Sequence, residues 1–422
     1  WDNCKIRLSI GSLGNQNVDD YYTYIESIDT SGTINYTFDG ESKANIAVED
    51  APKASNLTWE TATTYDLGVD LGFFDNRLHI TADTYMRDTK NMLCDGMQLP
   101  SVYGAEVPRQ NIADMRTKGW ELSIGWQDRL TLADKPFNYS ISAGVSDYVT
   151  KVTRYNNPSK LLSKYYVGQT LGELWGFSVG GLFTSDEEAA NYPVDQSYLN
   201  QQIITSVGEQ GLRAGDVKYL DLDGDNEISI GANTVDNPGD QRIIGNTLPR
   251  YAYNLKLGAS WNGFDFSAFF QGIGHQDWYP AGNAISFWGP YSRPYCSFIP
   301  SQFMDNVWSE TNTEAYFPRA RGYEALQTNY SLGSPNDRYL QNIAYFRLKS
   351  LTIGYTIPVL PRFIEDLRVY FSGENLFYFS PLKKHSKYVD PEQATSSDTR
   401  YENTGVAYNF SKTFSFGVSI TL

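Results

Sequence analysis

The chain has 422 residues, of which 41% are apolar and 15% aromatic, and its formal net charge is −15. The negative charge argues against nucleic-acid binding, which needs clustered lysine and arginine to neutralise phosphates. No apolar run reaches the roughly 18 residues of a transmembrane helix. The three cysteines, Cys4, Cys94 and Cys296, are too widely spaced to indicate a disulfide framework or a zinc site.

The N-terminal part predicts three strands. Apolar and polar residues alternate from Ile6 to Ile10, so this strand has one apolar face, and we expect it to end in a loop at 11–17. Residues 21–28 predict its return strand, and residues 33–38 a third strand. The sequence starts inside a strand pattern without a signal peptide, so we expect the chain to be the later part of a longer protein.

Hairpin signals follow in the central part of the chain. Alternating residues on both sides of Asp75-Asn76, and again on both sides of Asn262-Gly263, predict strands joined by two-residue turns. A further hairpin is expected to turn near 134–136. The predicted strands of this region are 65–73, 78–85, 119–126, 137–146, 251–261 and 264–270.

The strand predicted over 342–356 changes phase. Phe346 and Leu348 share one parity, whereas Leu351 and Ile353 take the other. An extra residue in one strand shifts the alternation in this way, so the sequence predicts a β-bulge around Lys349-Ser350.

The last thirteen residues, Phe410 to Leu422, predict a closing strand. Every second residue from Phe414 to Ile420 is apolar, and the residues between them are small or polar. An apolar band about 25 Å tall, crossed at roughly 45°, needs about eleven residues. Strands of ordinary soluble proteins have about five or six. Length and pattern together favour a transmembrane strand with one face in lipid.

The strands and their connections predict a transmembrane antiparallel β-barrel. We expect about twelve strands, in which tight turns alternate with long connections. Short turns on one side and long loops on the other are typical of outer-membrane barrels. The predicted long extracellular loops are 153–248, 272–340 and 380–408. The alternative is a soluble β-sandwich or propeller, which would have to bury strands of about a dozen residues.

The segment from Asp221 to Glu227 carries carboxylates at alternate positions. This is the spacing with which a hard cation such as Ca²⁺ is held at positions 1, 3 and 5 of a loop. The fit is partial, because Asn226 stands where glycine is expected and Ala232 stands where a bidentate Glu is expected. Asp236 or Asp240 is left to close the loop. The alternative is an exposed acidic turn. The candidate ligands of a structural Ca²⁺ are Asp221, Asp223, Asp225, Glu227 and Asp240.

The long connection after residue 272 is rich in Trp and Tyr beside hydrogen-bonding residues. Aromatic faces next to polar groups suit a sugar, which has apolar C–H faces and hydroxyl edges. Two alternatives compete: Tyr and Trp also gather at membrane interfaces and at protein–protein interfaces. The candidate substrate-binding residues are Trp278, Trp288, Tyr291, Arg293 and Tyr295.

The sequence offers no catalytic constellation. His79, His275 and His385 are scattered, without triad or metal spacing. Polar residues such as Asp83 and Glu121 are expected to face the lumen of any large barrel, so we assign them no catalysis. No phosphate-binding glycine loop and no nucleophile elbow is present.

Several stretches resemble SusC/RagA-like TonB-dependent transporters of the Gram-negative outer membrane. The match follows the family's order, but it covers only the later half of such a transporter, and Leu422 stands where the family usually ends in an aromatic residue. The matching stretches are NLTWETATTYDLGVDLGFFDNRL (56–78), LPSVYGA (99–105), NIADMRTKGWELSIGW (111–126), GDVKYLDLDGD (215–225), RIIGN (242–246), YFRLKSLTIGYTIP (345–358), SGENLFYFSP (372–381) and DPE (390–392).

The resemblance implies the fold and the activity to expect. Residues 1–422 would form the C-terminal portion of a barrel of about 22 strands, set in outer-membrane lipid, with the plug and the TonB-contacting segment outside this chain. The complete protein would import an oligosaccharide, or a peptide, under the lid of a SusD-like surface lipoprotein and with energy from TonB. The alternatives are a passive porin or an adhesin, and then an enzymatic barrel.

Overall fold

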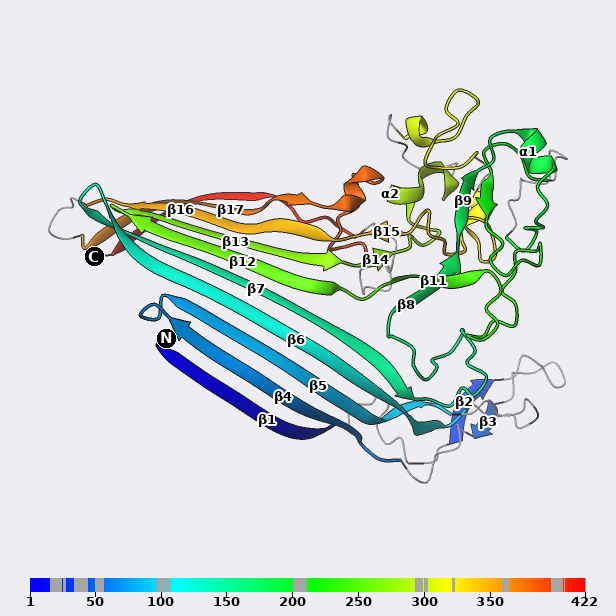
Figure 1. Cartoon of the computed structure of the whole chain (residues 1–422), viewed down its shortest axis with the longest axis horizontal. Coiled ribbons are helices and arrows are strands. Elements are labelled where there is room, and N and C mark those ends of the chain that lie inside the picture. Colours follow the sequence, from blue (N-terminus) through cyan, green and yellow to red (C-terminus); the bar gives the residue numbers. More distant parts are fainter. Residues whose placement is uncertain are drawn as a thin grey trace.

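The computed structural model describes residues 1–15, 25, 28–33, 45–49, 57–96, 102, 107–199, 211–292, 299, 303–320, 323–358, 364–395, 405 and 407–421. Ten antiparallel strands form one large sheet, in the order β1-β4-β5-β6-β7-β12-β13-β16-β17-β18. Figure 1 shows these strands side by side, with both chain ends at the end of the sheet where the tight turns lie. Their bounds are β1 Asn3–Asn15, β4 Glu60–Phe73, β5 Leu78–Asp95, β6 Arg109–Leu132, β7 Lys135–Arg154, β12 Arg250–Trp261, β13 Phe264–His275, β16 Tyr345–Thr356, β17 Asp366–Phe379 and β18 Thr413–Thr421.

The tight turn at Asn262-Gly263 has the two residues that the sequence predicts, whereas the turn at Asp75-Asn76 has four, 74–77, because β4 ends at Phe73 and β5 begins at Leu78. Asp75 and Asn76 have φ of 56° and 58°, and Asn262 and Gly263 have φ of 49° and 85°. Asn, Asp and Gly are the residues that most readily adopt this left-handed region, which two-residue hairpins require. The turn expected near 134–136 lies slightly earlier, since β7 already begins at Lys135.

The predicted β-bulge is confirmed. In the pairing of β13 with β16, Phe269 lies opposite Ser350 and Phe270 lies opposite Leu348. Lys349 is therefore skipped, and the register of β16 against β17 shifts between the same residues. The extra residue at Lys349 explains why the apolar parity changes along this strand.

The N-terminal strands differ from the prediction. β1 does not end before residue 11 but continues to Asn15, and it pairs along its whole length with β4, where Ile6 lies opposite Val69. Among the described residues, the hydrogen-bonded neighbour of β1 is therefore β4 and not the strand predicted at 21–28. Two short strands, β2 (Ile28–Thr33) and β3 (Asn45–Glu49), form a separate sheet. Most of 21–28 and 33–38 lies outside the described residues. The large sheet consequently has ten strands among the described residues, where the sequence predicts about twelve.

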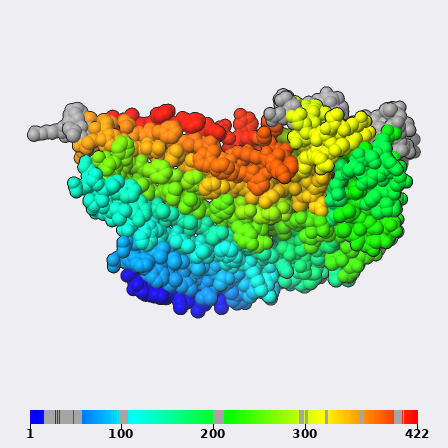
Figure 2. All heavy atoms as spheres, turned by 45° about the horizontal axis from the view of Figure 1, so that its top comes forward, coloured from blue at the N-terminus to red at the C-terminus, as the bar shows by residue number. Residues whose placement is uncertain are grey.

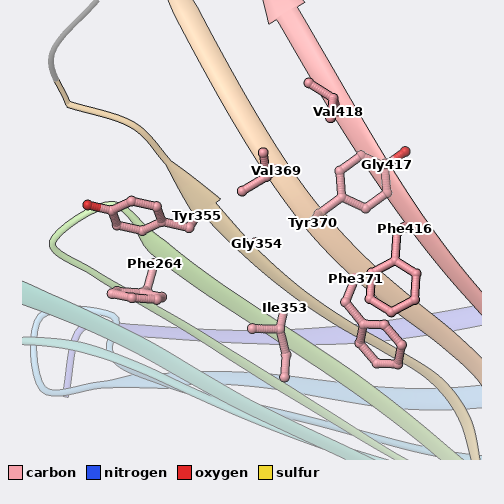
Figure 3. A pocket seen from close by; sticks show the side chains of 10 residues that line it. All are labelled: Phe264, Ile353, Gly354, Tyr355, Val369, Tyr370, Phe371, Phe416, Gly417 and Val418. Carbon is pink, nitrogen blue, oxygen red and sulfur yellow. The ribbon is translucent and has the colours of Figure 1, made fainter.

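The apolar parity of the strands faces outward. Phe416 is 84% exposed and Ile6 is 68% exposed, although both are large and apolar. A soluble sandwich or propeller would bury this face, so that alternative is wrong. The outer face near the tight turns is hollowed by a groove of about 470 Å³ between β16, β17 and β18. Figure 3 shows the apolar side chains that line it, among them Ile353, Val369 and Phe416.

The closing strand is shorter than predicted. β18 begins at Thr413 and not at Phe410. The Phe410 ring instead lies 5.1 Å from the Arg347 guanidinium and 4.4 Å from Lys349 Nζ. These cations attract the ring face, so Phe410 leaves the lipid-facing row.

The long connections fold into a cap at the other end of the sheet (Figure 1). We call the described parts of 153–248, 272–340 and 380–408, together with residues 341–342, the loop cap. None of the described helices has the length and hydropathy needed to cross a membrane. The cap elements are β8 Glu173–Phe177, β9 Val179–Leu182, α1 Asp186–Ala190, β10 Val217–Tyr219, β11 Gln241–Asn246, β14 Asp277–Trp278, α2 Ile285–Trp288, η3 Gly289–Tyr291, η4 Met304–Asn306, η5 Tyr323–Leu326, β15 Gln341–Asn342 and η6 Pro381–Lys384.

The main hydrophobic core of the described chain lies in the loop cap and not in the large sheet. One cluster of buried side chains joins all three connections, for example Tyr219 from the first, Trp288 from the second and Leu382 from the third. Figure 2 shows the corresponding green, yellow and orange atoms packed together at this end. The sheet has no core of its own because its inner face is polar and its outer face is exposed.

Candidate functional site: the barrel interior and the loop cap

Ion pairs between arginine and aspartate line the inner face of the sheet. Arg7 Nε of β1 donates to Asp70 of β4 at 2.8 Å, and its Nη1 lies 2.8 Å from Asp83 of β5. Arg368 of β17 donates to Asp265 of β13 in the same way, at 2.8 and 2.6 Å. The Arg7–Asp83 pair crosses β4 and the Arg368–Asp265 pair crosses β16, so these two pairs connect strands that do not share backbone hydrogen bonds.

A glycine of the middle strand makes room for each of these long pairs. Gly68 of β4 lies beneath Arg7 and Asp83, and Gly354 of β16 lies beneath Arg368 and Asp265. A Cβ atom at either position would collide with the paired groups. The glycines thus permit a bidentate pair to lie flat against the inner wall.

Five residues were predicted to bind substrate, and the three of them that the structure describes are buried. Trp278, Trp288 and Tyr291 are 1%, 0% and 2% exposed. Trp288 donates from Nε1 to the Pro280 carbonyl at 3.1 Å, and its ring lies 5.4 Å from that of Tyr339. In this arrangement no ring face is open to a ligand, so these residues act as packing of the loop cap. Arg293 and Tyr295 lie outside the described residues.

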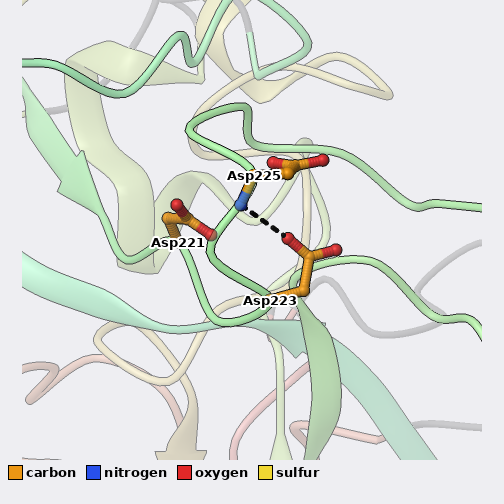
Figure 4. Close-up of side chains that lie close together, drawn as sticks. All are labelled: Asp221, Asp223 and Asp225. Atoms are coloured by element: carbon orange, nitrogen blue, oxygen red, sulfur yellow. Dashed lines mark hydrogen bonds between the residues drawn. The ribbon is translucent and has the colours of Figure 1, made fainter.

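The acidic segment brings three of its predicted metal ligands together. The carboxylates of Asp221, Asp223 and Asp225 offer oxygens within 4.8 Å of one another, as Figure 4 shows. Asn226 has a φ of 65°, so it adopts the backbone conformation that glycine usually provides at this position of a calcium loop.

Backbone amides hold the acidic segment in place. Asp221 accepts hydrogen bonds from the Gly224 and Asn226 amides at 2.6 and 2.9 Å, and these bonds lower its pKa. The pKa of Asp223 is raised, through desolvation and the neighbouring carboxylates. The crowded charge of three carboxylates is therefore balanced only partly by the loop itself.

The other two predicted ligands lie differently. Asp240 is fully buried, and its two carboxylate oxygens accept hydrogen bonds from the Leu222 and Ser229 amides at 2.6 and 2.8 Å. It connects the two ends of the acidic segment and does not belong to the group of three carboxylates. Glu227 lies outside that group as well, and its backbone forms a bridge with Asp195.

Sequence reasoning missed a buried ion-pair network between the sheet and the cap. Arg347 of β16 lies 2.5 Å from Asp390, and Lys349 lies 2.6 Å from Glu392. The side chains of Arg347 and Asp390 are 2% and 3% exposed. Asp390 and Glu392 belong to the DPE stretch, so the family resemblance was the signal that marked them. Alternation alone gave no reason to pair them with β16.

The three histidines do not form a common site. His385 of the cap stacks on Tyr316 with ring centroids 3.7 Å apart. Its burial, with Lys384 and Arg338 nearby, lowers its pKa to about 4. His275 lies 3.1 Å from Asp277, and His79 is exposed on β5. The three histidines therefore lie in different parts of the fold: the loop cap, the end of β13 and the start of β5.

The outward apolar face, the polar inner wall and the long capped loops define an outer-membrane β-barrel protein. The chain belongs to the family of TonB dependent receptor-like beta-barrels, which residues 1–421 match.

Known relatives and solved structures agree with this assignment. The chain is 26% identical to TonB-dependent receptor P3 of Formosa agariphila, with 99% of this chain and 39% of that protein covered. It is 24% identical to TonB-dependent receptor SusC of Bacteroides thetaiotaomicron, with 99% and 37% covered. A solved structure of the RagAB peptide transporter has a similar fold, with a TM-score of 0.63, 20% identity, and 92% and 38% of the two chains covered. The chain therefore spans about two fifths of the length of the relatives it matches.

Proposed function

We propose that the complete protein imports an oligosaccharide across the outer membrane by TonB-dependent transport, with a SusD-like surface lipoprotein as its lid. The observation that supports this proposal is the polar inner wall of the sheet, which lies next to a folded loop cap. A polar wall offers hydrogen bonds to a polar cargo, and the cap covers the extracellular end. Family membership supports the use of TonB, which would act through a region outside this chain.

The shared core of the cap favours an importer over a passive porin. All three connections contribute to one buried cluster, and the Arg347–Asp390 pair fixes this cluster to the barrel wall. Such a cap offers a defined surface on which a lipoprotein can dock, whereas an open pore needs no folded cover. An adhesin would also display folded loops, so the test has to measure transport.

Exposed aromatic side chains at the mouth favour a sugar as cargo. Tyr388 is 53% exposed and Tyr408 is 91% exposed, and Tyr388 directly follows Lys387 in the third connection. Arg293 and Tyr295 remain proposed ligand contacts. A peptide is the alternative cargo, because the RagAB neighbour is named as a peptide transporter.

The experiment combines purification with uptake. The full-length protein is extracted gently from outer membranes, and co-purifying proteins are identified by mass spectrometry. We expect a stoichiometric surface lipoprotein, and uptake of labelled oligosaccharide that stops when tonB is deleted. Uptake that persists without TonB, with no lipoprotein present, would establish a porin. Uptake of peptides alone would establish the peptide alternative.

We also propose that the acidic segment binds a structural Ca²⁺ through Asp221, Asp223 and Asp225. The proximity of the three carboxylates and the left-handed backbone at Asn226 support this proposal. A cation would offset the mutual repulsion of the carboxylates and stabilise the segment next to the cap core. Binding is tested by thermal unfolding with Ca²⁺ and with a chelator.

A further inference from the structure

A second apolar groove lies on the outer face of the sheet, between β1, β4, β5 and β6. These strands run side by side (Figure 1), and the groove has a volume of about 490 Å³. Ile10 and Leu67 line it from the outward parity and are 75% and 43% exposed. The outward side chains that line this groove include Leu8, Ile10, Tyr65, Leu67, Met86 and Lys118.

Lys118 of β6 brings a positive charge to the end of this groove nearest the loop cap. The Lys118 side chain is exposed and lies in register with Met86 of β5, which in turn lies opposite Tyr65 of β4. In the part of the chain that the structure describes, no carboxylate lies within ion-pair distance of Lys118. The ammonium group is therefore available to an anion placed at the end of the groove.

The next outward row toward the loop cap is polar across five neighbouring strands. Arg116 of β6 donates to Asp88 of β5 at 2.6 and 2.9 Å. On its other side, Arg116 lies directly opposite Lys151 of β7, where two positive charges repel each other. Lys151 is exposed, and among the described side chains no carboxylate pairs with it. The row consists of Ser12, Thr63, Asp88, Arg116 and Lys151.

The two rows carry an excess of positive charge. Arg116, Lys118 and Lys151, which we call the basic rim, face one carboxylate, that of Asp88. The carboxylate of Asp147, one row below Lys118, is taken up by its own ion pair with an arginine of β12. A phosphate monoester carries a charge of about −1.5 to −2 at neutral pH. Its charge therefore complements that of the basic rim.

The basic rim lies at the height expected for lipid headgroups. Lys118 and Asp128 are ten positions apart in β6, and Asp128 pairs with Arg77 beside the tight turn. At about 3.3 Å per residue and a tilt of roughly 45°, this distance spans about 23 Å, close to the apolar band of about 25 Å. Tyr65 and Trp120, which are 43% and 40% exposed, lie next to the rim, as aromatic residues do at membrane interfaces.

The groove between β16, β17 and β18 provides a contrast. It lies near the tight turns, and none of the described residues that line it carries a charge. An apolar groove alone accepts any acyl chain, whereas a groove that ends at cations also selects the headgroup. Free phosphate could use the cations but has no use for the apolar lining. The combination therefore favours a lipid.

We propose that this groove and the basic rim bind a membrane lipid whose headgroup carries a phosphate group, in the leaflet on the side of the loop cap. An acyl chain lies along Leu67 and Met86, and the phosphate lies at Lys118 and Lys151. The inference depends on the outward face of the sheet and not on the imported cargo, so its failure would leave the proposed function standing.

Native mass spectrometry of the full-length protein, purified in detergent, measures the binding of defined lipids. The probes are dimyristoyl phosphatidic acid, dimyristoyl phosphatidylcholine with the same chains and no net charge, and dihexanoyl phosphatidic acid with the same headgroup and short chains. We expect the first probe to bind about tenfold more tightly than either of the others. Its advantage over phosphatidylcholine should decrease as the salt concentration is raised.

Two results of this titration would overturn the proposal. Equal affinity for the two dimyristoyl lipids would show that the basic rim does not select a phosphate. Equal affinity for long and short chains, or displacement of the lipid by inorganic phosphate, would show that the groove takes no part.

Variants assign the binding to named residues. Lys118→Gln combined with Lys151→Gln should weaken phosphatidic acid binding about tenfold to thirtyfold, since one basic residue at a membrane surface contributes about fivefold. Phosphatidylcholine binding should not change. Lys256→Gln is the matched control, because Lys256 is an exposed lysine of the same sheet on the inner parity of β12, and it should leave all affinities unaltered. Unchanged phosphatidic acid binding in the double variant would contradict the proposed site.

The same spectra count the protein copies in each complex. We expect one copy of the protein with phosphatidic acid bound. A dimer that dissociates in the double variant would show that a second copy of the protein covers the groove, and the lipid assignment would then be wrong.

Discussion

Arg347 of β16 and Asp390 of the third connection lie 2.5 Å apart, and their side chains are 2% and 3% exposed. This pair joins the barrel wall to the core of the loop cap. Because both groups are removed from water, each depends on the other for its compensation. Together with the Lys349–Glu392 pair, the Arg347–Asp390 pair connects the cap to the barrel wall through residues 43 positions apart in the sequence.

Removing one partner of this pair should destabilise the cap strongly. Asp390→Asn leaves the buried Arg347 guanidinium with only the Glu392 carboxylate, which lies 3.4 Å away and is shared with Lys349, and should cost about 3–5 kcal/mol. Limited proteolysis and urea unfolding of the purified protein measure this loss. Asp236→Asn is the matched control, because its pair with Lys160 is exposed and contributes at most about 1 kcal/mol. Equal effects of the two variants would contradict the role of the buried pair.

Gly417 of β18 should not tolerate a side chain. It lies opposite Tyr370 of β17, and a Cβ atom there would collide with the tyrosine ring. Gly417→Ala should therefore cost about 1–3 kcal/mol, as overpacking does. Gly125→Ala in β6 is the control, because no other atom lies within 4 Å of its Cβ position. The midpoint of thermal unfolding in detergent compares the two, and similar midpoints would show that Tyr370 moves away freely.

The calcium proposal predicts a stability difference that depends on one carboxylate. At a free Ca²⁺ concentration of about 100 times Kd, binding adds about 2.7 kcal/mol to the free energy of unfolding. Thermal unfolding of the parent should therefore shift upward with Ca²⁺ relative to chelator. Asp223→Ala should abolish the shift, whereas Asp236→Ala should retain it, because that exposed residue lies outside the group of three carboxylates. Identical thermal unfolding of the parent protein in Ca²⁺ and in chelator would contradict the proposed calcium site.

The lowered pKa of His385 predicts that the free energy of unfolding of the cap decreases in mild acid. Burial lowers its pKa from 6.5 to about 4, so the unfolded chain binds a proton more readily than the folded one. The contribution of the neutral His385 imidazole to the free energy of unfolding is fully present above pH 6.5 and decreases as the pH falls from 6.5 toward 4. His385→Phe keeps an aromatic ring against Tyr316 and should flatten the pH dependence of unfolding in this window.

The strands were predictable because alternation is a local property. The tight turns at Asp75-Asn76 and Asn262-Gly263 and the bulge at Lys349 were readable for the same reason, since each depends on a few adjacent residues. The partner of β1 could not be predicted, because strands with the same alternation can all pair with it. Which strand does so depends on contacts between distant parts of the chain. Sequence reasoning therefore did not predict β4 as the neighbour of β1.

The core of the loop cap could not be predicted, because it consists of residues far apart in the sequence. Trp288 in the second connection packs against Tyr339, and the same cluster includes Tyr219 and Leu382 from the other two. An aromatic-rich loop looks the same in sequence whether its rings bind a ligand or pack together. Only the three-dimensional contacts show that Trp278, Trp288 and Tyr291 are covered.

The central claim is that the apolar parity of the strands faces lipid while the other parity faces the lumen. Spin labels at single cysteines along β18 test it in the full-length protein in liposomes, after Cys4, Cys94 and Cys296 are replaced by Ser. We predict that labels at Phe414, Phe416, Val418 and Ile420 are accessible to oxygen dissolved in the bilayer, and that labels at Ser415 and Ser419 are not. Equal accessibility of the two parities, or apolar-parity labels shielded from both lipid and water, would contradict the account.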